Sequence, residues 1–185
     1  MKYITAAVVL AVSCSALGGT VSEKKWLAGK GDHGYYAVTS SIQSPKETSF
    51  GVYFFPSYEC DAMLTVMSDT GKEIGSSDAK SHSFTKGEFQ LQIDKNDTWE
   101  VTTASVWTSN RYIYIGTRAA PGFAEDVLNQ IKFGRRLDVY LNGKFSSFSL
   151  YGSNKTVSLA RDACMSDLKE QSMQPESLID VKDFI

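Results

Sequence analysis

"RLDVYLNGKFSSFSLYGSNKTVSLARDAC", residues Arg136 to Cys164, has the pattern of a strand, a tight turn, a second strand and a helix. Apolar and polar residues alternate on both sides of Asn142-Gly143, and this dipeptide is the strongest short-range signal of a two-residue hairpin turn. A turn of that length fixes the register of the two strands. The predicted cross-strand pairs are Leu137 with Phe148, Val139 with Ser146, and Tyr140 with Phe145.

The end of this stretch predicts a helix over about residues 156–170. Apolar residues recur there at helical spacing from Val157 to Leu168, so Cys164 is expected to face the core. Three residues could cap the start of the helix. The candidates are Ser153, Asn154 and Thr156.

The string Gly-Ser-Asn-Lys-Thr at 152–156 raises the question of a phosphate-binding loop. Such a loop needs the pattern G-x-x-x-x-G-K-[ST], because several backbone amides must converge on one phosphate. Gly152 stands alone, and the strand before it belongs to a tight hairpin rather than to a βαβ unit. We therefore interpret Gly152 as a turn residue and exclude a nucleotide site.

A second helix is predicted over about residues 121–133. Its apolar residues have helical spacing, Glu125 and Asp126 lie in its first turn, and Lys132 lies in its last turn, as the helix dipole favours. Gly134 is placed to end this helix.

The rest of the chain is predicted to be mainly strands. Aromatic, β-branched and alternating residues mark each run, and turn residues separate the runs. His82 lies among small polar residues and is interpreted as part of a turn. The expected fold class is mainly β (α+β): one antiparallel β-sandwich or curved sheet with two helices. The predicted strands are 33–42, 52–55, 62–67, 88–94, 98–107 and 111–117.

The N-terminal residues 1–18 have the pattern of a secretory signal peptide. Lys2 precedes a short apolar run, which is followed by small residues and a polar stretch. The run is shorter than the roughly 20 residues that span a bilayer, so no transmembrane helix is expected. Cleavage near Gly19 would release a β-rich domain over 19–170 with a loosely docked tail over 171–185. Alternatively, "LAVSC" has the form of a lipobox, which would place a lipid anchor on Cys14.

Two cysteines, Cys60 and Cys164, remain after the signal. In an exported domain such a pair is expected to form a disulfide bond, and the expected location is therefore periplasmic or secreted, with a membrane-anchored lipoprotein as the alternative. No Cys-x-x-Cys motif or histidine cluster accompanies the pair, so no metal or cofactor is expected. Loss of Lys2 with the signal shifts the formal charge from −2 to −3, which argues against a nucleic-acid partner.

Few residues in the sequence suggest a catalytic or metal-binding role. Asp32 and His33 are adjacent between two glycines and could serve a metal or a proton transfer, although neighbouring loop residues usually point apart. No G-x-S-x-G motif is present, and Glu59 and Asp61 are interpreted as solvated surface carboxylates. Glycosylation sequons occur at Asn96 and Asn154.

The aromatic residues of the predicted strands suggest a second kind of site. In Tyr-Ile-Tyr-Ile, either the tyrosines or the isoleucines must face away from the core. If Tyr112 and Tyr114 face outward, they offer a platform for a partner or a glycan. If they face inward, they fill the core of a sandwich.

The order of elements from Phe123 to Cys164, with "GRRLDVYLNG" and "FSLYGS" between two helices, resembles the C-terminal part of small exported bacterial β-rich proteins. The invasion-associated locus B family is the nearest named group. The resemblance covers about a quarter of the chain. It implies a similar fold for this segment and assigns no catalytic or ligand-binding residue.

These observations together favour an exported, non-enzymatic envelope protein that binds a protein or envelope component, of an inhibitor, immunity or envelope-interaction type. A lipid-anchored assembly factor, dependent on Cys14, is one alternative. A small exported hydrolase that uses Asp32 and His33 is the other.

Overall fold

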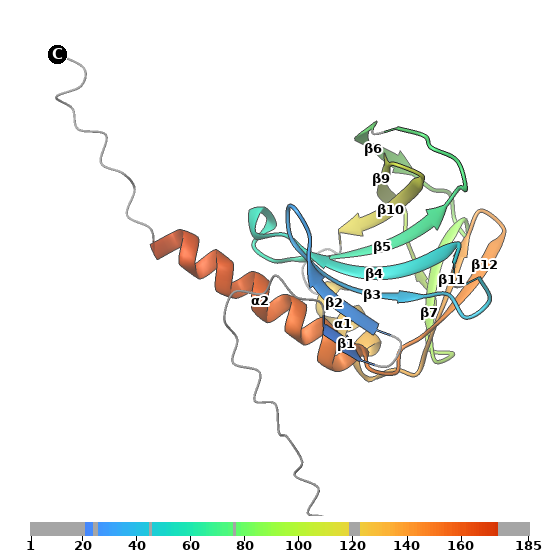
Figure 1. Cartoon of the computed structure of the whole chain (residues 1–185). Coiled ribbons are helices and arrows are strands. Elements are labelled where there is room, and N and C mark those ends of the chain that lie inside the picture. The colour runs from blue at the N-terminus through green and yellow to red at the C-terminus, as the bar shows by residue number, and fades with distance from the viewer. Residues whose placement is uncertain (1–20, 24–25, 45, 76, 119–122, 174–185) are drawn as a thin grey trace, which may run out of the picture.

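The computed structural model of the chain describes residues 21–23, 26–44, 46–75, 77–118 and 123–173 (Figure 1). The predicted signal peptide, with Cys14 and the cleavage site near Gly19, lies outside these residues, as do positions 174–185 of the predicted tail. The predicted fold class is confirmed. The described residues form two antiparallel sheets with two helices packed against them.

The larger sheet has eight strands among the described residues, in the order β1-β2-β3-β4-β5-β10-β9-β6, and Figure 1 shows that it is strongly curved. Hairpin connections join most of its neighbours, so the alternation of side chains carries over from strand to strand. Its strands are β1 (Val21–Glu23), β2 (Trp26–Lys30), β3 (Tyr35–Ser40), β4 (Thr48–Phe54), β5 (Ala62–Asp69), β6 (Ser77–Ser83), β9 (Thr103–Ser109) and β10 (Tyr112–Arg118).

The smaller sheet has four described strands in the order β12-β11-β7-β8. The predicted Asn142-Gly143 hairpin is confirmed with its register, since Leu137 pairs with Phe148, Val139 with Ser146, and Tyr140 with Phe145. Its strands are β7 (Phe89–Ile93), β8 (Trp99–Glu100), β11 (Arg136–Leu141) and β12 (Lys144–Ser149).

One core lies between the two sheets and the helices. In β4, for example, Phe50, Val52 and Phe54 are buried, as the alternation of apolar residues requires. The sheets meet where the backbone N–H of Ile42 donates to the carbonyl of Ser147 at 2.7 Å. The opposite face of the larger sheet, called the outer face below, points away from this core.

Helix α1 (Phe123–Phe133) agrees with the prediction over its described residues, while positions 121–122 lie outside them. The N–H of Gly134 donates to the carbonyl of Gln130 at 2.7 Å, so the predicted end of the helix is confirmed. Helix α2 (Ser153–Met173) is longer at both ends than the predicted 156–170. At its start, the buried hydroxyl of Ser153 donates to the carbonyl oxygen of Ile131 in α1 at 2.7 Å and so joins the two helices.

Helix α2 packs across β2 and β3 and is fixed to the larger sheet in two ways (Figure 1). The predicted disulfide is present between Cys164 and Cys60, with 5.9 Å between their Cα atoms. Three residues further along, Asp167 accepts hydrogen bonds from Lys30 Nζ at 2.9 Å and from the hydroxyl of Tyr35. Of the two described helices, neither has both the length and the apolar character of a membrane-spanning segment.

Two predictions about the strands were wrong. The predicted strand 98–107 is divided between the two sheets, because the N–H of Val101 donates to Phe89 and the carbonyl of Thr102 accepts from Phe84. The alternation therefore reverses after Thr102: Val101 and Ala104 are buried, whereas Thr102 and Thr103 are exposed. His82 lies in β6 rather than in a turn.

Candidate functional site

A band of aromatic and thioether side chains crosses the outer face of the larger sheet from β3 to β9. Each member is half-buried, and each contacts or directly faces the next on a neighbouring strand. Tyr36 faces Tyr53, the hydroxyl of Tyr53 lies 3.4 Å from the sulfur of Met67, and Met67 faces Tyr114. Tyr114 and Trp107 stack nearly in parallel, with ring centroids 5.3 Å apart. The aromatic band is Tyr36, Tyr53, Met67, Tyr114 and Trp107.

Glycines beneath the band hold its rings along the sheet. A Cβ atom at Gly29 would lie 2.6 Å from the hydroxyl oxygen of Tyr36, and one at Gly51 would lie 2.7 Å from the ring of Tyr53. These rings therefore occupy the space that side chains would take at the glycines, as aromatic residues do when they cover glycines in sheets. These two rings are half-buried on the outer face.

A cleft of about 340 Å³ lies beside the band, where β6, β9 and β10 meet the short helix η1 (Pro56–Tyr58). Its floor consists of small residues that are neighbours across the strands: Ser81 pairs with Ser105, and Ser105 pairs with Gly116. A side chain at Gly116 would fill the cleft and would also collide with the ring of Trp107, at 2.9 Å. The cleft therefore exists because this row of the sheet carries almost no side-chain bulk.

One wall of the cleft is a stack of side chains that continues the aromatic band. Phe55 stacks against Tyr53, with centroids 6.3 Å apart, and meets the edge of Tyr58 at 6.0 Å. The guanidinium carbon of Arg118 lies 4.8 Å from the centre of the Tyr58 ring, a cation–π arrangement. Arg118 Nη2 also donates to Asp61 Oδ2 at 3.0 Å.

The chain reaches this arrangement through a tight turn around the disulfide. Glu59 and Cys60 both adopt positive φ angles, 55° and 58°, and the N–H of Cys60 donates to the carbonyl of Phe55 at 3.0 Å. Cys60 lies between Tyr58 and Asp61, so its bond to Cys164 fixes the part of the wall that carries both side chains.

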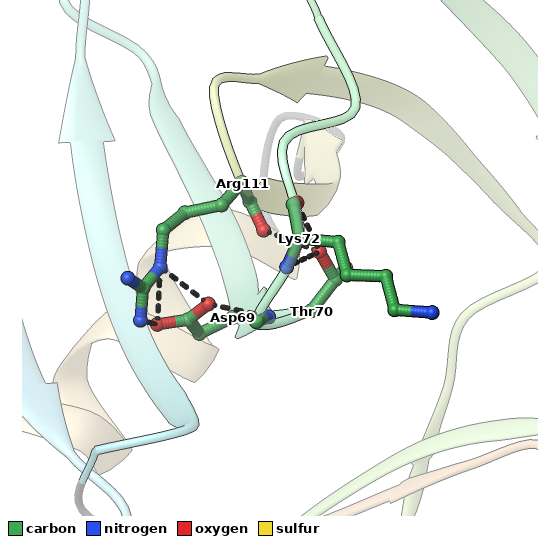
Figure 2. A network of polar contacts seen from close by, with 5 residues as sticks. Asp69, Thr70, Lys72 and Arg111 are labelled. Carbon is green, nitrogen blue, oxygen red and sulfur yellow. Dashed lines mark hydrogen bonds and ion pairs between the residues drawn. The ribbon is translucent and has the colours of Figure 1, made fainter.

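The end of β10 opposite Arg118 carries a second arginine–aspartate pair, which Figure 2 shows. Nε of Arg111 donates to both carboxylate oxygens of Asp69, at 2.7 and 2.8 Å, and the N–H of Gly71 donates to the same carboxylate at 2.8 Å. These donors, Arg111 foremost, hold the pKa of Asp69 below its usual range. The Arg111 guanidinium carbon lies 5.9 Å from the centre of the Tyr112 ring. The outer face therefore has an arginine–aspartate pair at each end of β10.

Tyr53 and Tyr114 are neutral at physiological pH. Burial is the main cause that raises the pKa of Tyr53 and of Tyr114 above the usual value of 10.0. Each of the two arginines is paired with an aspartate. The site as a whole therefore offers aromatic rings, hydroxyl groups and paired charges.

The predicted site residues fall in different places. Asp32 and His33 are exposed at the turn between β2 and β3, where the N–H of Gly31 donates to the carbonyl of Gly34 at 2.8 Å, and they line neither the band nor the cleft. Tyr114 belongs to the band, and the more exposed Tyr112 lies beside it with ring centroids 6.3 Å apart.

Sequence reasoning missed the cleft. Asp61 was interpreted as a solvated carboxylate, and its side chain is indeed exposed, but it also lines the cleft with Tyr58 and Arg118. The spacing Tyr-x-Tyr-x-Gly-x-Arg over 112–118 puts two rings, a glycine and an arginine on one face, and this was the available signal. Among the described residues, no group of three His, Cys, Asp or Glu side chains could hold a metal ion.

No family model matches this chain, and searches of curated proteins and of solved structures found no match either. The resemblance of residues 123–164 to the invasion-associated locus B family stays a prediction.

Proposed function

We propose that this chain is an exported, non-enzymatic binding protein that holds an envelope component on the outer face of its larger sheet. The observation that carries the proposal is the continuity of the band with the cleft through Tyr53, Phe55 and Tyr58. Glycines and the disulfide fix these groups before any partner arrives, and such pre-organisation reduces the entropy lost on binding.

The chemistry of the cleft favours binding over turnover. A hydroxyl nucleophile requires an adjacent base, and a general base needs a free carboxylate or imidazole near the reacting group. The carboxylate of Asp61 is engaged by Arg118, and Ser81 and Ser105 are held in a flat row of the sheet rather than on a sharp turn. The groups of the cleft are thus arranged to donate and accept hydrogen bonds.

Export is supported by the pattern of residues 1–18 and by the bridge between Cys60 and Cys164, because disulfides persist in oxidising compartments. Lipidation at Cys14 would tether the same binding face to a membrane, which is the assembly-factor form of the proposal. The intact mass of protein from the membrane fraction distinguishes the two forms.

The test is capture of envelope components by the purified domain. Tyr58→Ala removes an exposed ring of the cleft wall, and Tyr140→Ala removes a comparably exposed ring from the smaller sheet. We expect the wild type and Tyr140→Ala to retain the same components and Tyr58→Ala to lose them. Equal capture by the two variants, or no capture by the wild type, would contradict the proposal.

A further inference from the structure

We infer that the component bound by the outer face is an uncharged glycan chain, which extends across the aromatic band with one sugar unit in the cleft. This inference rests on the proposed function and names the class of ligand. Four observations lead to it: the half-buried rings on the outer face, the polar groups of the cleft, the pairing of the two arginines and the length of the band.

The rings offer the surface that a sugar ring requires. Tyr36, Tyr53 and Trp107 lie over glycines on the outer face and are half-buried, so part of each ring is accessible to a ligand. The face of an aromatic ring carries the negative part of its quadrupole, so it attracts partly positive C–H groups. A pyranose ring presents C–H groups on its faces and hydroxyl groups around its rim, and it can therefore stack on such a surface.

The polar groups of the cleft can form hydrogen bonds with the hydroxyl groups around the rim of a sugar ring. Arg118 and Asp61, 3.0 Å apart, place a planar donor beside an acceptor, an arrangement that suits the adjacent hydroxyl groups of a sugar. The hydroxyls of Ser81 and Ser105 on the floor can both donate and accept. These side chains can thus form hydrogen bonds with hydroxyl groups of a ligand in the cleft.

The balance of charge argues for an uncharged ligand. Arg118 is paired with Asp61 and Arg111 with Asp69, so the charge of each of these two arginines is compensated by a carboxylate. An anionic chain would have to compete with the two aspartates for the arginines, and a cationic chain would have to compete with the arginines. A neutral chain uses both members of each pair without separating them.

The sheet face also disfavours an extended peptide. The backbone groups of β4, β5 and β10 are paired with strands on both sides, so these three strands have no backbone donors or acceptors to offer to a peptide. Peptides that pair with sheets do so at free edges. A sugar chain needs only side-chain partners, and those are what the face provides.

The band is long enough for several sugar units. It runs from β3 through β4, β5 and β10 to β9, and strands about 4.8 Å apart give it a length of about 19 Å. A chain that crosses the strands would contact Tyr36 and Tyr53 toward one end and Trp107 toward the other. A single sugar could contact only one part of this surface, so we expect affinity to rise with chain length.

The experiment measures binding of the disulfide-bonded domain to three hexasaccharides by calorimetry. The probes are the neutral hexamer of N-acetylglucosamine, the cationic hexamer of glucosamine and the anionic hexamer of galacturonic acid. We expect the neutral hexamer to bind at least about tenfold more tightly than either charged hexamer and than its own dimer, where tenfold is 1.4 kcal/mol.

The variants locate the site. Tyr58→Ala and Trp107→Phe should each weaken the neutral hexamer about tenfold or more, and Tyr140→Ala should leave its affinity unchanged, with thermal melting to verify folding. If the neutral hexamer does not bind, or binds equally to Tyr58→Ala, the glycan inference is overturned. If envelope capture still depends on Tyr58 in that case, the partner is a protein and the proposed function stands. If neither dependence is found, both proposals fail.

Discussion

The indole ring of Trp107 lies against the backbone of Gly116, in the space where a side chain at that position would stand. A Cβ atom built at Gly116 would approach Trp107 Cη2 to 2.9 Å, the terminal methyl of Met63 to 2.8 Å and the hydroxyl oxygen of Thr65 to 3.0 Å. Gly116 therefore fixes the position of a ring in the band and leaves room for the cleft at the same time.

Gly116→Ala should destabilise the domain by about 1–3 kcal/mol, because the added methyl group has to displace Trp107 or Met63. Denaturant unfolding measures the loss, and the tryptophan emission should shift as Trp107 moves. Ser105→Ala, on the neighbouring strand, removes a hydroxyl without adding bulk and is the matched control. An alanine at 116 that leaves both stability and emission unchanged would show that the ring does not rest on this glycine.

Cys164→Ser should lower the free energy of unfolding by about 4–5 kcal/mol, since the bond closes a loop with a sequence separation of 104. Denaturant unfolding of the oxidised wild type and the variant provides the comparison. The double variant Cys60→Ser/Cys164→Ser should be no less stable than the single one, because one bond is lost in both. Unchanged melting on addition of a reductant would contradict the bridge.

Tyr35→Phe and Tyr36→Phe form a matched pair on opposite faces of β3. The buried hydroxyl of Tyr35 donates to Asp167 on α2, so its removal should cost about 1–2 kcal/mol of stability. Tyr36 lies on the outer face, and loss of its hydroxyl should change stability by less than about 0.5 kcal/mol. Equal losses in the two variants would mean that the contact with Asp167 does not hold the helix.

The stability of the domain should fall in acid below about pH 4. The pKa of Asp69 is lowered from its usual 3.8 by Arg111 and the Gly71 N–H, and that of Asp167 by Tyr35 and Lys30. A carboxyl with a lowered pKa in the folded state stabilises the fold above its unfolded pKa, and this contribution is lost as the pH falls through the folded value.

Asp69→Asn tests this dependence. The variant should be less stable than the wild type near neutral pH and should lose less stability below about pH 4, measured by denaturant unfolding across the pH range. Asp97→Asn, at an exposed carboxylate in the turn between β7 and β8, is the control. Parallel pH profiles for the wild type and Asp69→Asn would argue against a role for the Arg111 pair.

Local patterns in the sequence were sufficient to predict an element whose own residues fix its pairing or its end. The Asn142-Gly143 turn fixes the pairing of β11 with β12, and the apolar spacing before Gly134 defines α1. The pattern was insufficient where the chain passes from one sheet to the other. At Val101 and Thr102 the backbone pairs with β7 on one side and with Phe84 on the other, and a single alternating run conceals that change.

The candidate site was less predictable than the fold because its members come from distant parts of the chain. Tyr58, Asp61 and Arg118 are unremarkable surface residues in the sequence, and the order of strands in the larger sheet brings them together. β10 inserts between β5 and β9, and no local signal specifies that insertion. The outward tyrosines were recognised as a possible platform, whereas the glycines that support their neighbours were not.

The position of Cys60 between Tyr58 and Asp61 has a consequence for the order of events in the life of the chain. A newly made chain in a reducing cytoplasm contains all the residues of the cleft. It lacks the disulfide bond that joins the cleft wall to α2. If the chain is exported as proposed, recognition of the proposed partner is expected to follow formation of the disulfide, which would occur after the chain leaves the cytoplasm. The affinity for the neutral hexamer, measured before and after reduction of the disulfide, shows how strongly binding depends on oxidation.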